Sequence, residues 1–168
     1  MIDILLSDIT ALDTDAVVNA ANEHLRAGTG VCGAIFAAAG ADALTAACRR
    51  IGHCGTGSAV ITPGFGLKAK YIIHAVGPVW RGGGQGEAEA LYSAYARSLA
   101  LAAENGCRSV GFPLISTGVY GYRVEPAWKI ALQACADHLA AGSDMRIVFA
   151  VRNRAIFDAG MQALRSLR

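Results

Sequence analysis

The sequence carries little charge. Charged residues make up 17% of the 168 positions, whereas hydrophobic residues make up 54%. A chain with this balance can bury enough apolar surface to fold, which excludes an intrinsically disordered protein. The formal net charge is 15 − 13 = +2, which is too small to predict nucleic-acid binding by itself.

Paired cysteines and clustered metal ligands are also missing. The cysteines number five, which is odd, and no two of them form a Cys-x-x-Cys pair: Cys32, Cys48, Cys54, Cys107 and Cys135. This pattern predicts reduced thiols and argues against both a disulfide framework and a zinc site. His24, His53 and His138 lack the spacing of metal ligands, so we expect no metal and no cofactor.

Long apolar runs are absent as well. No run reaches the roughly 18 residues that a membrane-spanning helix needs, and the first residues do not follow the pattern of a signal peptide. We therefore expect a cytoplasmic protein with no membrane partner. A chain of this length suits a single domain, here 1–168, which can bury a core without disulfides or metals.

The sequence does contain an alternation of short apolar runs with longer helical patterns, which predicts an α/β fold built on a mostly parallel sheet covered on both faces. The predicted strands are Ile2–Leu6, Ala16–Ala20, Ser58–Thr62, Tyr71–Val76, Ser109–Leu114 and Arg146–Val151. The predicted helices are Val31–Arg50, Glu87–Asn105, Glu125–Ala140 and Asn153–Leu167. Residues 81–86 are expected to form an exposed loop.

Two glycine-rich segments follow predicted strands. One spans Gly28–Gly33 and opens a predicted helix; the other spans Ser116–Gly121. Glycines let a backbone approach a ligand closely, and a helix start presents free N–H groups, so two such loops facing each other would suit a diphosphate. A single loop of this kind is more often an ordinary turn. Neither segment matches the Walker pattern or the dinucleotide fingerprint.

A few polar residues stand at the ends of the predicted strands. Asn19 and Asn22 are either turn-forming residues or amides placed to bind ligand hydroxyls. Asp8 is either a helix cap or a ligand contact. His74 lies inside a strand, where a histidine is more often packed and hydrogen-bonded than catalytic. The sequence shows neither a Ser-His-Asp order nor a Gly-x-Ser-x-Gly motif.

Taken together, these segments resemble the macrodomain family over nearly the whole chain. The matching stretches are Asp8–Thr10, Asp15–Asn22, Gly28–Gly33, Gly55–Gly57, His74–Pro78 and Pro113–Gly121. The similarity is greatest to the MacroD type, whose members remove ADP-ribose from acidic side chains and deacetylate O-acetyl-ADP-ribose. The resemblance implies a three-layer α/β/α sandwich around a mixed, mostly parallel six-stranded sheet.

The resemblance also assigns roles to residues. It implies that Asp8 accepts from the adenine amino group, that the Ile9 amide donates to the ring, and that Asn22 bonds the distal ribose. The two glycine-rich loops would hold the diphosphate, and Tyr120 would shape the distal pocket. The implied ligand contacts are Asp8, Ile9, Ala21, Asn22, Gly30, Val31, Cys32, Gly33, Pro113, Ser116, Thr117, Gly118, Val119, Tyr120 and Arg152; the implied catalytic group is Asn22, Cys32 and Tyr120.

Two positions depart from the MacroD pattern. Those enzymes carry an aspartate ten positions after the asparagine that corresponds to Asn22, and this chain has Cys32 at that position. A thiol has a reference pKa of about 8.5 and is a poor base at neutral pH unless a helix N-terminus lowers it. Many relatives also place an aromatic residue over the adenine, where this chain has Arg152, whose guanidinium plane can stack on a base or simply point to solvent. Alphaviral macrodomains, some of them active hydrolases, share both features.

Three functions remain open at this point: a hydrolase of ADP-ribose derivatives, a reader that binds ADP-ribose without turnover, and a regulator of ribonuclease activity like some bacterial relatives. Cys32 is the best support for the reader, and the small net charge argues against the regulator. The expected partners are ADP-ribose, its derivatives and mono-ADP-ribosylated proteins. We expect no contact with nucleic acid other than ADP-ribosylated ends, and a monomer.

Overall fold

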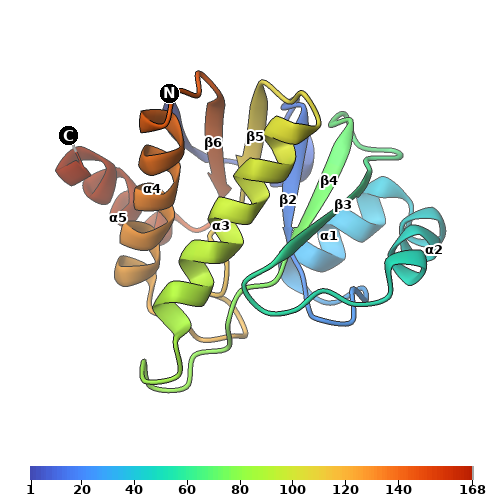
Figure 1. The fold of residues 1–168 in the computed structure, drawn as a ribbon, viewed down its shortest axis with the longest axis horizontal. Coiled ribbons are helices and arrows are strands. Elements are labelled where there is room, and N and C mark those ends of the chain that lie inside the picture. Colours follow the sequence, from blue (N-terminus) through green and yellow to red (C-terminus); the bar gives the residue numbers. More distant parts are fainter. Residues whose placement is uncertain (168) are drawn as a thin grey trace.

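The computed structural model of the chain describes residues 1–167 and contains one six-stranded sheet (Figure 1). Its strands are β1 (Ile2–Leu6), β2 (Ala16–Ala20), β3 (Ala59–Pro63), β4 (Tyr71–Ala75), β5 (Ser109–Phe112) and β6 (Arg146–Val151). They lie in the order β1-β6-β5-β2-β4-β3, and only β3 runs antiparallel to its neighbour. The predicted mixed, mostly parallel sheet is confirmed.

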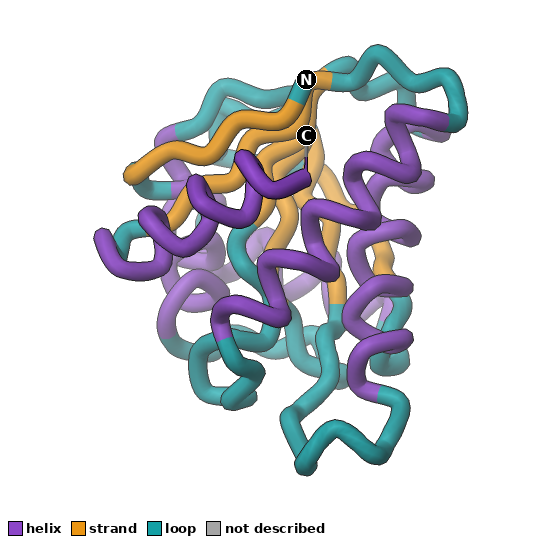
Figure 2. Tube along the Cα trace, turned by 90° about the vertical axis from the view of Figure 1, so that its left-hand side faces the viewer, coloured by secondary structure: helices purple, strands orange, loops and turns teal. Residues whose placement is uncertain are grey.

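Helices cover both faces of this sheet. One face carries α3 (Glu87–Glu104), α4 (Val124–Ala140) and α5 (Arg154–Leu167), and the other carries α1 (Gly30–Ala39) and α2 (Ala41–Ile51) (Figures 1 and 2). A short 3-10 helix, η1 (Ile9–Ala11), follows β1. Alternate residues of β2 enter the two cores: Val18 packs beneath α3 and α4, and Val17 packs beneath α1 and α2. This is the period-two alternation of a strand buried on both faces, and it confirms the three-layer sandwich.

The predicted helix over Val31–Arg50 is wrong in one respect, because the structure divides it into α1 and α2. The division falls at Gly40, whose φ of +104° is a backbone conformation that few other residues adopt. The two helix axes consequently meet at 110°. A helical pattern in the sequence continues across this glycine, which explains why the break was not predicted.

The other element boundaries differ from the predicted ones by at most two residues. The predicted strand Ser109–Leu114 ends at Phe112, because Pro113 has no N–H group to donate to the sheet. Strand β3 runs from Ala59 to Pro63 instead of Ser58–Thr62, and β4 ends at Ala75 instead of Val76. Within the described residues, no single helix is long and apolar enough to cross a membrane. Helices α1 and α2 have sufficient length and hydropathy only when they are counted together, and they are bent relative to each other by 110°.

Candidate active site

The connections after β2 and β5 open a crevice in the middle of the sheet. These two strands are parallel neighbours. The chain leaves β2 towards α1 on one face and leaves β5 towards α4 on the opposite face. In open α/β sheets, ligands bind at such a point, beyond the carboxyl ends of the strands where successive connections diverge. Both glycine-rich segments lie in these two connections.

A cavity of about 730 Å³ occupies this crevice. It runs across the carboxyl ends of β1, β6, β5, β2 and β4, which at ~4.8 Å between neighbouring strands makes it roughly 19 Å long. A cavity of this size suits a small-molecule ligand, and its length favours an extended one. The lining residues that are not among the implied ligand contacts are Ser7, Ala20, Gly28, Thr29, Ala34, Gly77, Leu114, Ile115, Ala150, Val151, Asn153 and Ile156.

The first glycine-rich loop lies against the start of α1. A Cβ atom on Gly33 would sit only 2.5 Å from the Gly28 carbonyl oxygen, so only glycine allows this close turn. Gly30 begins the helix with a φ of +60°. Thr29, the residue before it, makes no side-chain capping bond to the helix. The first N–H groups of α1 therefore remain available to an anion in the cavity.

The second glycine-rich loop is also folded closely upon itself. The Tyr122 N–H donates to the Ser116 carbonyl oxygen at 2.9 Å. Ser116 is buried, holds a φ of +70° and has a hydroxyl group with no hydrogen-bond partner. Such a conformation costs of order 1–3 kcal/mol in a non-glycine residue, and a buried unpaired hydroxyl adds to the cost. Both features are typical of a residue held ready for a ligand at the cavity wall.

Asp8 lies at the β1 end of the cavity and serves as a helix cap. Its Oδ1 accepts from the Thr10 N–H at 2.9 Å and from the Thr10 hydroxyl at 2.8 Å. These bonds, aided by the nearby charge of Arg152, hold the pKa of the Asp8 carboxyl below its ordinary value. Asp8 is therefore ionised at neutral pH, and its second oxygen stays free to accept from a ligand. The capping role and the ligand-binding role are compatible.

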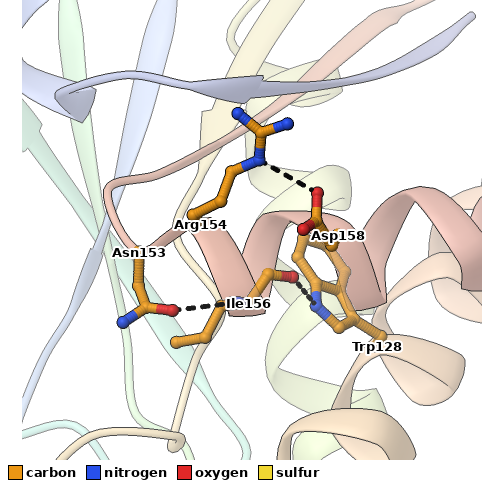
Figure 3. A network of polar contacts seen from close by, with 5 residues as sticks. All are labelled: Trp128, Asn153, Arg154, Ile156 and Asp158. Carbon is orange, nitrogen blue, oxygen red and sulfur yellow. Dashed lines mark hydrogen bonds and ion pairs between the residues drawn. The ribbon is translucent and has the colours of Figure 1, made fainter.

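Arg152 and the first turn of α5 complete the same end of the cavity. Arg152 is exposed and lies directly before Asn153, whose Oδ1 accepts from the Ile156 N–H at 3.0 Å (Figure 3). The indole N–H of Trp128 donates to the Ile156 carbonyl oxygen at 2.9 Å and fixes this turn to α4 (Figure 3). Asn153, which the sequence predicted as the first helical residue, is thus the cap that precedes α5.

Asn22 lies near the opposite end of the cavity, where its side chain closes the loop that follows β2. Its Nδ2 donates to the Arg26 carbonyl oxygen at 2.9 Å, and its Oδ1 accepts from the Arg26 N–H at 3.0 Å. Within this loop Leu25 is buried with a φ of +56°. Asn22 therefore has the turn-forming role, and it also lines the cavity. Each amide atom keeps capacity for one further hydrogen bond.

Cys32 is a neutral group in this structure. Its Sγ lies 3.6 Å from the Arg26 carbonyl oxygen and 3.7 Å from Asn19 Nδ2. Burial raises the pKa of the Cys32 thiol, outweighing the opposing effect of the hydrogen bond from Asn19. The start of α1 therefore does not make this cysteine a thiolate at neutral pH. The thiol instead links the loop after β2 to the buried amide of Asn19.

Asn19 and His74 form a buried polar pair behind Cys32. Asn19 Nδ2 lies 3.1 Å from His74 Nδ1, and because an amide NH₂ only donates, Nδ1 accepts and the ring proton sits on Nε2. His74 Nε2 then donates to the Thr62 hydroxyl at 3.0 Å. Complete burial lowers the pKa of His74 to about 4. His74 is a packed, neutral residue, as its place inside a strand suggested, and neither it nor Asn19 lines the cavity.

Tyr120 lies on the second glycine-rich loop and lines the cavity. Burial, together with the charge of Glu23, raises the pKa of its phenol, so Tyr120 keeps its proton. Both candidate groups for proton transfer at this end of the cavity, Cys32 and Tyr120, are therefore protonated at neutral pH.

The structure brings together all but one of the residues implied by the resemblance. Gly33 does not line the cavity, because its backbone packs against Gly28, while Gly28 and Thr29 take its place at the wall. Among residues 1–167, no three His, Cys, Asp or Glu side chains meet in a way that could hold a metal ion. All five cysteines are free and buried.

A mixed, mostly parallel six-stranded sheet with a ligand-sized cavity at its switch point is typical of α/β proteins that bind a small-molecule ligand there. Comparison with known proteins is more specific. The macro domain family model matches residues 18–131. A macro domain-containing protein of Chlorobaculum tepidum is 54% identical over 140 residues, covering 83% of this chain and 81% of its own length. An O-acetyl-ADP-ribose deacetylase of Cronobacter sakazakii is 48% identical over 154 residues, covering 89% and 85%.

Solved structures agree. The Oceanobacillus iheyensis macrodomain with ADP has a TM-score of 0.93 and 36% identity, over 98% of this chain and 90% of that one. A Trypanosoma brucei macrodomain in complex with ADP-ribose has a TM-score of 0.88 and 38% identity, over 97% and 68%. The chain belongs to the macrodomain family.

Proposed function

We propose that this macrodomain binds ADP-ribose and hydrolyses its derivatives, with O-acetyl-ADP-ribose and mono-ADP-ribosyl groups on acidic side chains as substrates. The observation that carries the proposal is the cavity itself: an extended crevice with an ionised Asp8 at one end, Asn22 and Tyr120 at the other, and the free N–H groups of a helix start between them. Relatives of about half-identical sequence are named O-acetyl-ADP-ribose deacetylase.

The order of the strands gives the ligand its direction. Asp8 follows β1 at the edge of the sheet, and its free oxygen suits the adenine amino group, with the Arg152 guanidinium beside the base. The diphosphate lies over the start of α1 and the Ser116–Tyr120 backbone, where N–H groups meet negative charge. The distal ribose then reaches Asn22 and Tyr120 near β2 and β4.

The ionisation states of the cavity side chains determine how the hydrolysis can proceed. Cys32 and Tyr120 are both protonated at neutral pH, so neither supplies a strong base. A water molecule held by Asn22 and the Cys32 loop attacks the anomeric carbon of the distal ribose. Its proton passes to a diphosphate oxygen of the substrate, the bond from that carbon to the acidic side chain breaks, and the free carboxylate leaves. With an O-acetyl ester, the same water attacks the acetyl carbonyl carbon while its proton passes to the diphosphate oxygen. The bond from that carbon to the ribose oxygen then breaks, the ribose oxygen takes the proton back to become a hydroxyl, and acetate leaves.

Positioning supplies the main rate enhancement in this scheme, because holding reactants in an attacking geometry lowers a barrier by several kcal/mol without any strong base. The hydrogen-bonded Asn22 loop is suited to that task. The alternative is a reader that binds ADP-ribose without turnover, which Cys32 in place of aspartate favours.

Two measurements test the proposal. Calorimetry should detect binding of free ADP-ribose, and at 100 times the Kd the bound ligand should add about 2.7 kcal/mol to the free energy of unfolding. A turnover assay should then release acetate from O-acetyl-ADP-ribose and ADP-ribose from a mono-ADP-ribosylated protein. Binding without release of either product would favour the reader, and no heat at millimolar ADP-ribose would overturn the whole proposal.

A further inference from the structure

Glu87, the first residue of α3, does not line the cavity but is one of the most firmly held carboxylates in the chain. It is only 2% exposed. Its carboxylate accepts from the backbone N–H groups of Arg81 at 2.9 Å, Gly83 at 2.8 Å and Gln85 at 2.6 Å. Burial by itself would raise the pKa of Glu87, but these hydrogen bonds lower it to about 2, so it stays ionised at any physiological pH.

These bonds give residues 81–86 a defined shape. The segment precedes α3 at the lower edge of the molecule (Figure 1) and is the exposed loop predicted from the sequence. Three of its glycines, Gly82, Gly83 and Gly86, have positive φ angles. The three N–H groups turned towards the carboxylate belong to every second residue, and they form an anion-binding hollow similar to the backbone nests that bind phosphate elsewhere; we refer to this hollow as the nest. Here the chain fills the nest with its own carboxylate.

The closed segment rests on Trp80. A Cβ atom on Gly83 would lie 2.9 Å from the edge of the Trp80 ring, so the two are in close contact. The Trp80 ring also packs against the Tyr122 ring, with ring centroids 4.9 Å apart at an angle of 64°. An edge-to-face pair of this kind adds stability beyond simple burial.

Trp80 in turn holds the cavity wall. Its backbone N–H donates to the Tyr120 carbonyl oxygen at 2.8 Å. Within residues 1–167, this is the one backbone hydrogen bond that ties residues 117–121 to a segment outside their own loop. Val119, in the middle of that loop, is 91% exposed, so side-chain packing there contributes little. The position of Tyr120 therefore depends on Trp80.

We propose that Glu87 is a positioning residue for the reaction: its carboxylate fixes residues 81–86, these fix Trp80, and Trp80 holds the Tyr120 loop at the distal-ribose end of the cavity. The assignment of that end rests on the proposed function. The contacts from Glu87 to Tyr120 do not depend on it. Loss of the carboxylate should therefore release the Tyr120 loop, whether or not the ligand is ADP-ribose.

Two matched pairs of variants separate this role from general destabilisation. Glu87→Ala is compared with Glu89→Ala, which removes an exposed carboxylate from the same helical turn. Gly83→Ala places a methyl group against Trp80 at a positive φ, whereas Gly84→Ala adds it to open space with no such φ. In the second pair, Gly83→Ala disturbs Trp80 while the Glu87 carboxylate stays in place. This pair can therefore test the role of Trp80 even if Glu87→Ala folds poorly.

Amide hydrogen exchange in the ligand-free protein measures directly how firmly the Tyr120 loop is held. In Glu87→Ala and Gly83→Ala, the amides of Trp80, Gly121 and Tyr122 should exchange faster than in the wild type, while those of β2 and β6 keep their protection. In Glu89→Ala and Gly84→Ala all of these amides should behave as in the wild type. Added acetate should restore protection in Glu87→Ala by entering the empty nest, and chloride at equal ionic strength should not.

Ligand binding then tests the functional consequence. The Kd of ADP-ribose should rise about tenfold in Glu87→Ala, as expected when one hydrogen bond to the ligand is lost. The Kd of AMP, which lacks the distal ribose, should change by less than about twofold because its site is distant. If the wild type does not bind ADP-ribose, the proposed function fails, and the exchange result still decides the role of Glu87.

Two results would overturn the inference. One is unchanged exchange at Trp80 and Tyr122 in both Glu87→Ala and Gly83→Ala. The other is an equal loss of affinity for ADP-ribose and AMP accompanied by loss of protection throughout the sheet, which would make Glu87 a general stabilising residue.

Discussion

The two ends of the cavity hold their polar groups in different ways. At the β1 end, Asp8 is ionised, one of its oxygens is free, and Arg152 stands exposed beside it. Near β2, both amide atoms of Asn22 are already engaged by Arg26, and Cys32 is a neutral thiol. The first end is built to recognise a ligand by charge, whereas the second is built to hold a fixed geometry. Affinity and turnover should therefore respond to different substitutions.

The largest effect should follow from Asn22→Ala. The change removes both hydrogen bonds that close the loop after β2, together with the amide to which we assign the distal ribose in the proposed function. We expect turnover to fall more than a hundredfold, or about 2.7 kcal/mol of barrier, because attack geometry is lost. Single-turnover kinetics at saturating substrate would measure it. A variant that turns over normally would show that the loop does not position the reaction.

Asp8→Ala should weaken binding with little effect on the chemical step. Losing a charge-assisted hydrogen bond costs roughly 1.5–3 kcal/mol, so the Kd of ADP-ribose should rise about tenfold or more, whereas kcat at saturation stays close to that of the wild type. Calorimetry and steady-state kinetics give the two quantities. Asp13→Ala, which removes an exposed carboxylate that does not line the cavity, is the control. A collapse of kcat with unchanged affinity would contradict the assigned direction of the ligand.

The network behind Cys32 should make folding sensitive to pH. His74 has a pKa of about 4 in the folded protein against 6.5 when unfolded. Because the unfolded chain binds the proton more tightly, the stability contributed by neutral His74 is complete above pH ~6.5 and is lost as the pH falls towards about 4. Between pH 7 and pH 5 the loss should be about 2 kcal/mol.

Urea unfolding of the wild type and of His74→Gln at both pH values measures this contribution. The variant should lose most of the pH dependence that the wild type shows over this range. His138, whose pKa burial also lowers, offers a matched change in His138→Gln, which should retain the contribution of His74. An identical pH dependence in wild type and His74→Gln would show that His74 is not the titrating group.

The smallest effect should come from Cys32→Ala. Alanine keeps the start of α1 and removes only a neutral thiol with long contacts to Arg26 and Asn19. We expect turnover within about tenfold of the wild type, or ~1.4 kcal/mol of barrier. The variant Cys32→Asp would sharpen the comparison. Higher turnover in this variant than in the wild type would show that a carboxylate supplies the base that the neutral thiol does not.

Much of this fold is predictable from local sequence. The strands β1, β2 and β6 have the predicted bounds. In β2 and β6 the apolar runs that predict them are buried, whereas β1 is an edge strand whose Leu5 and Leu6 are exposed. The break at Gly40 was not predictable, because it depends on a single backbone angle inside a helical pattern. The termini of β5 and α5 shifted for similarly local reasons, a missing N–H at Pro113 and a capping bond at Asn153.

The two glycine-rich loops, Asp8 and Asn22 could be offered as ligand contacts from residue type and position, with turn and capping roles as the alternatives. Their assigned roles came only from the family resemblance, and the contacts behind them were not predictable at all. Nothing in the spacing of Glu87 and Trp80 indicates that they support Tyr120, which lies more than thirty positions away in the sequence. Likewise, the pairing of Asn19 with His74 joins two strands that only the sheet brings together. Such long-range contacts are set by topology, which local patterns do not specify.

The most direct test of the account is a single-turnover comparison of the wild type, Cys32→Ala and Asn22→Ala on O-acetyl-ADP-ribose, with ADP-ribose affinity measured in parallel. The account predicts that Cys32→Ala stays within about tenfold of the wild type, while Asn22→Ala loses far more. An inactive Cys32→Ala protein that binds ADP-ribose with normal affinity would contradict it and make the thiol an essential group.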